Sequence, residues 1–364
     1  MSISYIENAL ALEDYLTQKN LTWEQCMLPT RMFFKETFPV RIPIKYADLI
    51  DWENPNDPLR MMVIPDPREH EVKDYELIDP IGDTTHEPVP GLVHRYPDRA
   101  LLILTTYCGV HCRFCFRREY IGKPRHVDIT ACFEYLSKHP EIREVIFTGG
   151  DPATFPEGFL FSVLEKLSHI DHIKFVRFHT RALVMDPRMN PDSWLNVLKV
   201  LKGKQVLFAL HINHPKEISK DLKKLVGKLR QRGVALLSQT VLLKGVNDTT
   251  ETLKELFVSL VGIGIQPYYL HHLDYARGTH HFRISVENGQ KLFSSLRGQI
   301  PGHCIPEYVV DLPGGDGKYP VMWLKDLGNG MYEAKNYRGE RVEYKDPSFV
   351  IPANAGIQTI SISI

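Results

Sequence analysis

From residue 93 onward, short apolar runs alternate with amphipathic stretches along the chain. Two of the amphipathic stretches predict helices: apolar residues recur every three or four positions in 215–230, and Asp248 and Glu251 stand in capping-box positions before a similar face in 248–260. The apolar runs predict strands at 101–105, 145–148, 175–180, 206–211, 234–240, 268–271 and 308–311. Repeated alternation of this kind is typical of a parallel sheet, so we expect an α/β fold with a full or partial (β/α) barrel. An open doubly wound sheet is the alternative.

The segments outside this alternation have a different character. Residues 6–19 and 22–26 predict short helices, and the prolines that recur in 54–91 predict an irregular arm, because each removes an amide donor and favours extended backbone before it. The last stretch, 348–364, lacks acidic and basic side chains and is β-prone, and we assign it no function. The predicted organisation is a helical cap with the arm (1–92), a barrel (93–320) and a C-terminal extension (321–364).

The residues that follow the predicted strands favour the barrel over the open sheet. Barrel active sites are built at the carboxyl ends of several strands. A lone buried histidine or glutamine is usually a satisfied structural group, but a whole series of strands ending in such residues predicts a shared site. The polar or glycine residues at these ends are Cys108; Gly149, Gly150 and Asp151; His179 and Arg181; His211 and Asn213; Gln239; His271 and Asp274; and Asp311.

Composition narrows the kind of ligand and the cellular compartment. Lysine plus arginine and aspartate plus glutamate both total 44 in 364 residues, so no overall field favours nucleic acid or an anionic membrane. We therefore expect a small-molecule ligand. The sequence has no apolar run long enough to span a bilayer and no N-terminal signal pattern. Six cysteines without a secreted framework indicate a reducing compartment, so we expect a cytoplasmic protein.

Cys108, Cys112 and Cys115 form a tight group, C-x3-C-x2-C, directly after the first predicted barrel strand. Thiolates this close repel one another, so an iron-sulfur cluster or a zinc ion would have to neutralise them. Structural zinc sites and electron-transfer clusters take four protein ligands, and no fourth cysteine follows within the next dozen residues. One metal position would therefore stay open for a substrate. A reduced-cysteine turn or a partial zinc site is the other interpretation.

A glycine-rich motif near residue 315 ends in Lys318. It does not have the spacing of a phosphate-binding P-loop, and tyrosine follows the lysine, which removes the main support for nucleotide hydrolysis. A lysine on a flexible glycine-rich loop could form a Schiff base if its pKa were lowered inside a site. On this motif alone, a surface turn with an exposed lysine is the favoured interpretation.

Taken together, six motifs resemble the lysine 2,3-aminomutase family of the radical S-adenosylmethionine (SAM) superfamily. The resemblance runs in consistent order from about residue 93 to residue 320. The motifs are 94–99, the cysteine motif with Phe116, Arg117 and Arg118, Gly149-Gly150-Asp151, 239–248, 271–283 and 313–318. The resemblance implies a partial barrel with a 4Fe-4S cluster, SAM and pyridoxal 5'-phosphate (PLP). It also implies an isomerase that shifts an amino group between carbons 2 and 3, interconverting L-lysine and L-β-lysine.

The resemblance further implies roles for individual residues. Lys318 would carry PLP as a Schiff base, Arg95 would bind the phosphate of PLP, and Arg117 would bind the substrate carboxylate. The residues implied at SAM are Gly149, Gly150 and Asp151, with His211 and Gln239 as further contacts. The residues implied at the cluster are Cys108, Cys112 and Cys115, and those implied at the ε-ammonium of lysine are Asp274 and Asp311.

Several alternatives stay open from sequence. The substrate could be ornithine, arginine or glutamate, the protein could be a non-enzymatic module stapled by a metal, or it could be a radical SAM enzyme without PLP. An electron donor such as flavodoxin or ferredoxin is an expected partner. The sequence leaves open a homo-oligomer, and also whether the product serves modification of elongation factor P or another pathway.

Overall fold

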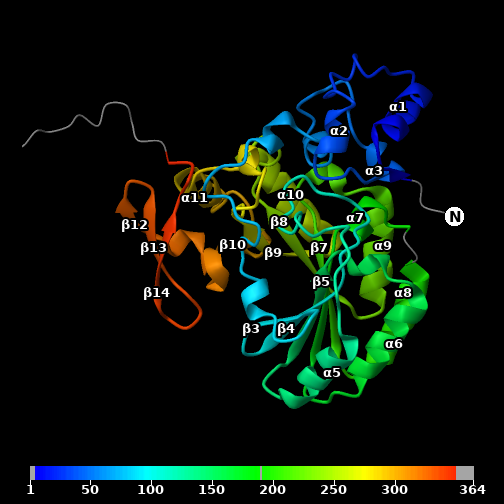
Figure 1. The fold of residues 1–364 in the computed structure, drawn as a ribbon, viewed down its shortest axis with the longest axis vertical. Helices are drawn as coiled ribbons and strands as arrows, with labels where there is room; N and C mark the ends of the chain where they lie inside the picture. Colours follow the sequence, from blue (N-terminus) through cyan, green and yellow to red (C-terminus); the bar gives the residue numbers. More distant parts are fainter. Residues whose placement is uncertain (1–4, 189–190, 350–364) are drawn as a thin grey trace, which may run out of the picture.

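The computed structural model describes residues 5–188 and 191–349, and a nine-stranded sheet forms its centre (Figure 1). Hydrogen-bonded neighbours follow the order β11-β10-β9-β8-β7-β6-β5-β4-β3, so the chain adds one strand after the next across the sheet. This arrangement confirms the α/β fold. The strands are β3 (Leu92–Tyr96), β4 (Arg99–Thr105), β5 (Glu144–Gly149), β6 (Phe175–Thr180), β7 (Gln205–His211), β8 (Ala235–Val241), β9 (Gln266–His271), β10 (Glu307–Leu312) and β11 (Gly317–Pro320).

The strand order decides between the two predicted architectures. The strand pairs from β4–β5 to β9–β10 are all parallel and follow chain order, whereas a doubly wound sheet reverses its strand order at a switch point. The sheet curls into a nearly closed barrel, and the backbone N–H of Lys318 in β11 donates to the hydroxyl of Tyr96 in β3 over 2.8 Å. The expected partial barrel is confirmed, and the open doubly wound alternative is wrong.

The two edge strands of the barrel are not predicted by the sequence pattern. Strand β3 pairs antiparallel with β4, and β11 pairs antiparallel with β10. Both are short and carry polar side chains, including Arg95 and Lys318, so neither forms the apolar run that marks the inner strands. These edges complete the cavity wall described below.

Helices pack on the outside of the barrel, as Figure 1 shows for α5, α6, α8 and α9. Helix α9 has Ser219 as its N-cap. Its predicted apolar face is buried and consists of Leu222, Leu225, Val226 and Leu229. A separate 3-10 turn, Pro215–Glu217, precedes it where the sequence pattern predicts one continuous helix. The helices are α5 (Ile129–Lys138), α6 (Glu157–Ser168), α7 (Ala182–Met185), α8 (Pro191–Val197), α9 (Lys220–Gln231), α10 (Thr250–Ile263) and α11 (Val286–Ser294).

The start of α10 corrects one sequence expectation. Its N-cap is Thr249, whose side-chain oxygen accepts a hydrogen bond from the backbone N–H of Thr252, so the proposed capping box of Asp248 and Glu251 is wrong. Threonine caps helices nearly as well as aspartate, and the buried face that begins at Leu253 fixes the helix one residue later.

The N-terminal segment covers one end of the barrel (blue in Figure 1). It builds its own apolar core, which Val110 and Phe114 from the segment after β4 also join. Residues 23–27 form turns instead of the expected short helix, because Met27 adopts φ 47° and Pro29 follows. The elements are β1 (Tyr5–Ile6), α1 (Ala9–Gln18), α2 (Phe33–Glu36), β2 (Ile42–Pro43), α3 (Ile44–Ala47) and α4 (Pro58–Met61).

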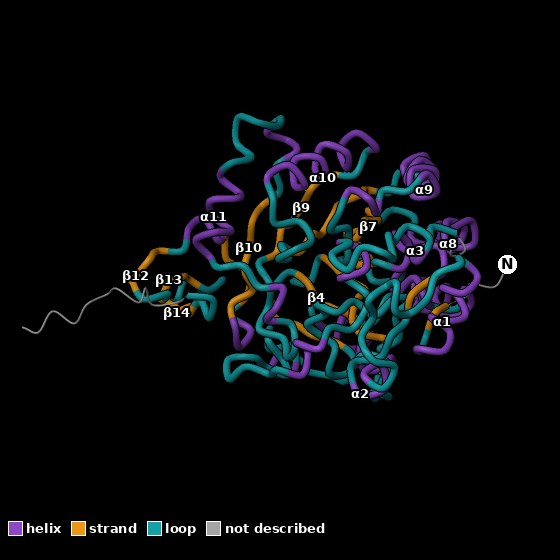
Figure 2. The backbone as a smooth tube through the Cα atoms, turned by 90° about the horizontal axis from the view of Figure 1, so that it is seen from above, coloured by secondary structure: helices purple, strands orange, loops and turns teal. Residues whose placement is uncertain are grey.

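After the barrel, a small antiparallel sheet stands to one side (Figure 2). Its strands are β12 (Lys325–Gly328), β13 (Met331–Lys335) and β14 (Arg341–Lys345). Most of the predicted sticky tail, 350–364, lies outside the described residues. Within the part of the chain that the structure describes, no helix is both long and apolar enough to cross a membrane.

Candidate active site

A cavity of about 260 Å³ opens at the carboxyl ends of the barrel strands. Parallel strands present these ends on one face, so residues far apart in sequence meet there. The predicted site residues that line the cavity are Arg95, Cys108, Cys112, Cys115, Arg117, Gly150, Asp151, His211, Gln239, Asp274, Asp311 and Lys318. Gly149 does not line it.

The three cysteines lie on the segment between β4 and α5, and their side chains border the cavity. Burial raises the pKa of the Cys112 thiol to about 12, and it shifts the pKa of Cys108 and Cys115 in the same direction. A thiolate here needs a positively charged partner, which an iron-sulfur cluster supplies when bound. Across residues 5–188 and 191–349, no three His, Cys, Asp or Glu side chains are grouped to hold a single metal ion.

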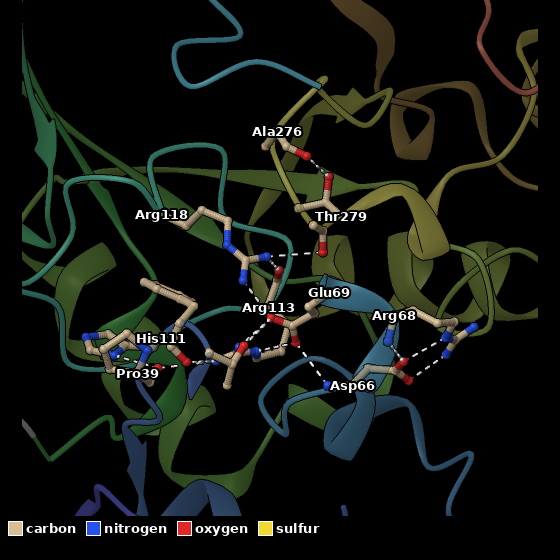
Figure 3. Close-up of polar contacts among 12 residues, drawn as sticks. Pro39, Asp66, Arg68, Glu69, His111, Arg113, Arg118, Ala276 and Thr279 are labelled. Atoms are coloured by element: carbon tan, nitrogen blue, oxygen red, sulfur yellow. Dashed lines mark hydrogen bonds and ion pairs between the residues drawn. The ribbon is translucent and has the colours of Figure 1, made fainter. Parts of the chain in front are cut away.

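The cysteine loop, residues 108–118, is anchored by a buried carboxylate from the arm (Figure 3). Glu69 accepts hydrogen bonds from Arg113 Nε at 2.8 Å and from Arg118 Nη2 at 2.6 Å. Arg113 also donates to the carbonyl of Phe38, and Arg118 to the carbonyl of Gly278. Burial alone would raise the pKa of Glu69, but the two guanidinium groups hold it below its ordinary value. The arm therefore fixes the backbone that carries the cysteines.

Gly149 ends β5 and Gly150 follows it, where this strand packs against the end of β4 and the two residues before Cys108. Gly149 has φ +101°, and a Cβ there would lie 2.3 Å from the side chain of Ile103. A Cβ on Gly150 would lie 2.3 Å from the carbonyl oxygen of Tyr107. Glycine is required at both positions to bring the strand end against the backbone beside Cys108.

The carboxylate of Asp151 forms hydrogen bonds with neighbouring groups of the protein. It accepts hydrogen bonds from the backbone N–H groups of Ala153, Arg181 and Ala182 and from the hydroxyl of Thr180. These bonds join the end of β5 to the end of β6. Asp151 thus holds two strand ends of the cavity wall together.

Lys318 lies in strand β11 and not in the flexible loop that its glycines suggest. The strand register places it opposite Asp311, and its Nζ donates to both carboxylate oxygens at 2.7 and 2.6 Å. Burial alone would raise the pKa of Asp311, but the Lys318 ammonium and His271 hold it below its ordinary value. Because Lys318 lines the cavity, the surface-turn interpretation is wrong.

Asp274 follows the end of β9 and supplies the second acid of the cavity wall. Its Oδ1 is buried and has no hydrogen-bond partner among the described residues. Burial, followed by the negative charge of Asp311, raises the pKa of Asp274 to about 7. An unsatisfied carboxylate oxygen near a second carboxylate is an environment that favours a cation.

His179, His211 and Gln239, from β6, β7 and β8, contribute uncharged polar groups to the cavity wall. Burial keeps the pKa of His179 and of His211 well below its ordinary value, so both imidazoles are neutral at pH 7. Gln239 Nε2 lies 3.4 Å from His179 Nδ1, and His211 Nε2 lies 3.2 Å from Asn213 Oδ1. Such groups suit the uncharged polar parts of a ligand.

Comparison with known proteins agrees with this site. Residues 102–257 match the Radical SAM superfamily. The chain is 37% identical over 320 residues to the L-lysine 2,3-aminomutase of Methanococcus maripaludis, covering 86% of this chain and 73% of that protein. This chain belongs to the lysine 2,3-aminomutase family. Within the family it is 33% identical to the Escherichia coli L-lysine 2,3-aminomutase, covering 86% of this chain and 96% of that protein.

The lysine 2,3-aminomutase family is not uniform in substrate. The glutamate 2,3-aminomutase of Clostridioides difficile is 35% identical over 83% of this chain and 72% of its own length. Among solved structures, a radical SAM methyltransferase from Sphaerobacter thermophilus aligns with a TM-score of 0.40 and 18% identity, covering 60% of this chain and 68% of that one.

Family membership makes the chain an isomerase of the radical SAM type, with a 4Fe-4S cluster, SAM and PLP as cofactors. The cavity contains side chains of the chemical types that bind these groups. Its thiols can ligate iron, its lysine can bind an aldehyde, and its arginines can bind phosphate or carboxylate.

Two residues at the site of this aminomutase-family chain are not assigned by the sequence analysis. Arg181 is named only as a polar strand end, yet it lines the cavity with Nε and Nη1 unpartnered among the described residues. Asp83 contacts Arg95 and Arg117. Asp83 lies in the proline-rich arm, where the sequence has no periodic pattern that would mark it. Arg181 directly follows a barrel strand, and this position is a signal that could have identified it.

Proposed function

We propose that this protein interconverts L-lysine and L-β-lysine. The observation that carries the substrate assignment is the unsatisfied Oδ1 of Asp274 near the carboxylate of Asp311 in the cavity wall. Two neighbouring carboxylates are unfavourable unless a cation lies between them, and the side-chain ammonium of lysine is such a cation. The L-lysine 2,3-aminomutases among the relatives support the same substrate.

The side-chain charge separates the candidate amino acids. Two unit charges about 4 Å apart interact by on the order of 4 kcal/mol at an effective dielectric constant near 20. The acids would attract a lysine side chain and repel a glutamate side chain by comparable amounts, which argues against glutamate. Ornithine and arginine carry the same charge as lysine and are the nearer competitors.

Asp311 exchanges its cation in this proposal. In the ligand-free protein the ammonium of Lys318 is its closest cation. Lys318 would hold PLP through Nζ, and this would leave Asp311 available for another cation. The side-chain ammonium of the substrate then occupies the space between Asp311 and Asp274.

The arginines receive the anionic groups in this proposal. Arg95 binds the phosphate of PLP and Arg117 binds the substrate carboxylate, because planar guanidinium groups form paired hydrogen bonds with both. The substrate is thereby fixed at its two ends, with its α- and β-carbons between them. Such fixation orients the reacting carbons and excludes water.

The remaining residues are proposed to hold the other two cofactors. The cluster ligands are Cys108, Cys112 and Cys115, and the residues facing SAM are Gly149, Gly150, Asp151, His211 and Gln239. When bound, the cluster and SAM supply the radical that removes a substrate hydrogen, and PLP supplies the π-system for amino migration. A one-electron donor such as flavodoxin or ferredoxin completes the system, which suits the reducing cytoplasm.

The test is a substrate comparison on the anaerobically reconstituted enzyme. L-Lysine, L-ornithine, L-arginine and L-glutamate are supplied separately, and the β-amino acid product is quantified. We expect lysine to be preferred, and Asp274→Asn and Asp311→Asn to lower lysine turnover by about a hundredfold or more. Asp221→Asn, an exposed acid on α9, is the matched control and should match the wild type. A wild type that prefers glutamate, or full lysine turnover in both variants, would show that the cationic pocket does not exist.

A further inference from the structure

We infer that Asp83 is a positioning residue that sets how Arg95 and Arg117 present their guanidinium groups to anions. This inference rests on the proposed function of the two arginines. Asp83 Oδ1 accepts from Arg95 Nη2 at 3.0 Å, and Asp83 Oδ2 accepts from Arg117 Nε at 3.0 Å and Nη2 at 2.7 Å. Both arginines line the cavity, whereas Asp83 is not among its lining residues. One carboxylate therefore bridges the two cations that the function requires.

The hydrogen bonds decide which edges of the arginines stay free. Arg95 Nη2 is occupied by Asp83 and by the carbonyl of Ile81, which leaves Nε without a partner among the described residues. The Nε–Nη2 edge of Arg117 faces Asp83, and its Nη1 donates to Thr148. The Nη1 groups of Arg95 and Arg117 do not contact Asp83, and they are the groups left to meet an anion; Arg95 Nη1 lies 4.0 Å from Asp311 Oδ1. A guanidinium group whose orientation is fixed in advance loses less freedom when it binds an anion.

Charge gives a second reason for a carboxylate at this position. The side chains of Arg95, Arg117 and Asp83 are all nearly buried, with 8%, 8% and 6% of their surface exposed. Burial lowers the pKa of Arg117, but the Asp83 carboxylate outweighs it and the net direction is upward. Without Asp83, two buried guanidinium groups would repel each other across the same space. With it, the pair keeps one net positive charge to meet a phosphate or a carboxylate.

The arm holds Asp83 in place through a tight turn. Asp79 accepts hydrogen bonds from the backbone N–H of Asp83 and of Thr84. A Cβ on Gly82, which has φ +67°, would lie 2.7 Å from the backbone of Gly314, so this turn packs directly on the glycines that lead into Lys318. The position of Asp83 is therefore fixed relative to both arginines and to Lys318.

Comparing PLP with pyridoxal, which lacks the phosphate, tests the inference on the full-length protein. Binding is followed by Schiff-base absorbance and needs no amino-acid substrate. Because hydrogen bonds between charged groups are the stronger ones, we expect Asp83→Asn to weaken PLP binding by about ten- to a hundredfold. Pyridoxal binding should change by less than about twofold, because pyridoxal lacks the anion that Arg95 receives.

A second comparison, between lysine and lysinamide as substrates, tests Arg117. In lysinamide an amide replaces the carboxylate of lysine. Asp83→Asn should raise the KM for lysine about tenfold and leave the KM for lysinamide within about twofold, because only the carboxylate pairs with Arg117. The matched control is Glu87→Gln, which removes an acid from the same arm whose partner, Arg125, does not line the cavity. Its ratios of PLP to pyridoxal affinity and of lysine to lysinamide KM should equal those of the wild type.

Equal losses for PLP and pyridoxal in Asp83→Asn, or no loss for either, would overturn the inference, since a merely structural role does not distinguish the two. If Asp83→Asn proves too unstable to purify, the comparison is made on Asp83→Glu, which keeps the charge but moves the carboxylate by one methylene. A selective loss for PLP is expected there too, and an unselective loss overturns the inference. A wild type that binds no PLP would contradict the proposed function instead.

Discussion

Asp311 and Asp274 are chemically identical side chains to which the fold gives opposite properties. The ammonium of Lys318 and the imidazole of His271 keep Asp311 ionised. Asp274 lacks a partner for Oδ1 among the described residues, and burial and the charge of Asp311 raise its pKa to about 7. A proton on Asp274 is therefore part of the ligand-free state near neutral pH.

This raised pKa predicts how stability depends on pH. The folded protein holds a proton on Asp274 that the unfolded chain releases near pH 4, so the contribution is fully present at low pH and is lost as pH rises to about 7. The groups that act on Asp274 are Asp311, Lys318, Arg283 and Arg117. Asp274→Asn lacks this titrating group. We therefore expect its free energy of unfolding, relative to that of the wild type, to rise by on the order of 1–3 kcal/mol as the pH is raised from 5 to 8. Chemical denaturation of the ligand-free proteins across this range measures it.

An unchanged difference in unfolding free energy between the two proteins from pH 5 to pH 8 would contradict this prediction. Lysine should reduce the effect, since its ammonium favours the ionised form of Asp274.

Among the elements, the cysteine loop shows most clearly how a local motif depends on a distant segment. Glu69, in the 3-10 helix Pro67–His70, is the shared partner of Arg113 and Arg118 (Figure 3). Glu69 also accepts a hydrogen bond from the backbone N–H of Asp66, the N-cap residue of the same 3-10 helix. The loop that carries the three cysteines is therefore shaped by an acid of the arm.

We predict that Glu69→Gln disturbs this loop, because it leaves two buried guanidinium groups without a counter-charge. Removing one partner of a buried ion pair costs about 3–5 kcal/mol, so thermal denaturation should show a clear loss of stability. Iron bound per chain after anaerobic reconstitution should also fall. Glu71→Gln is the matched control, because Glu71 is an exposed acid of the same arm whose ion-pair partners are Lys73 and, at 3.8 Å, His280. Normal iron content and stability in Glu69→Gln would show that the anchor is dispensable.

On the scale of the whole molecule, two smaller bodies, the N-terminal cap and the small sheet, pack against the barrel domain. The N-terminal cap packs its core against the cysteine loop, and the small sheet β12–β14 packs against the segment after β9. Tyr344 of β14 is 1% exposed and stacks on Tyr275, the residue next to Asp274, with ring centroids 5.5 Å apart. The small sheet thus supports the wall of the cavity from outside.

Tyr344→Ala is predicted to destabilise the whole protein. Removing a buried aromatic ring costs about 3–5 kcal/mol, since the lost contacts leave a cavity. Chemical denaturation should show this loss, whereas Glu343→Ala, at an exposed neighbouring position on β14, should stay close to the wild type. Unfolding of the small sheet in a separate transition, with the barrel unaffected, would show that it does not support the barrel.

The sequence by itself determined the features that depend on neighbouring residues. The apolar runs located the seven parallel strands to within about two residues, because each is buried between helices and the cavity. The cysteine spacing and the strand-end residues located most of the cavity wall, since parallel strands bring their carboxyl ends to one face. Asp311 was located as the end of the last predicted strand, and the role of Lys318 was implied by the family resemblance of the short motif 313–318.

Only the tertiary structure decided the partners of these residues. Glu69 and Asp83 lie in a proline-rich arm without periodicity, and they meet Arg113, Arg118, Arg95 and Arg117 solely because the arm folds over the barrel face. The pairing of Lys318 with Asp311 follows from the antiparallel edge strand β11, which is too short and polar to be predicted. Hydrogen bonds and charges act through space over a few ångströms, so which of them form depends on folding and not on sequence separation.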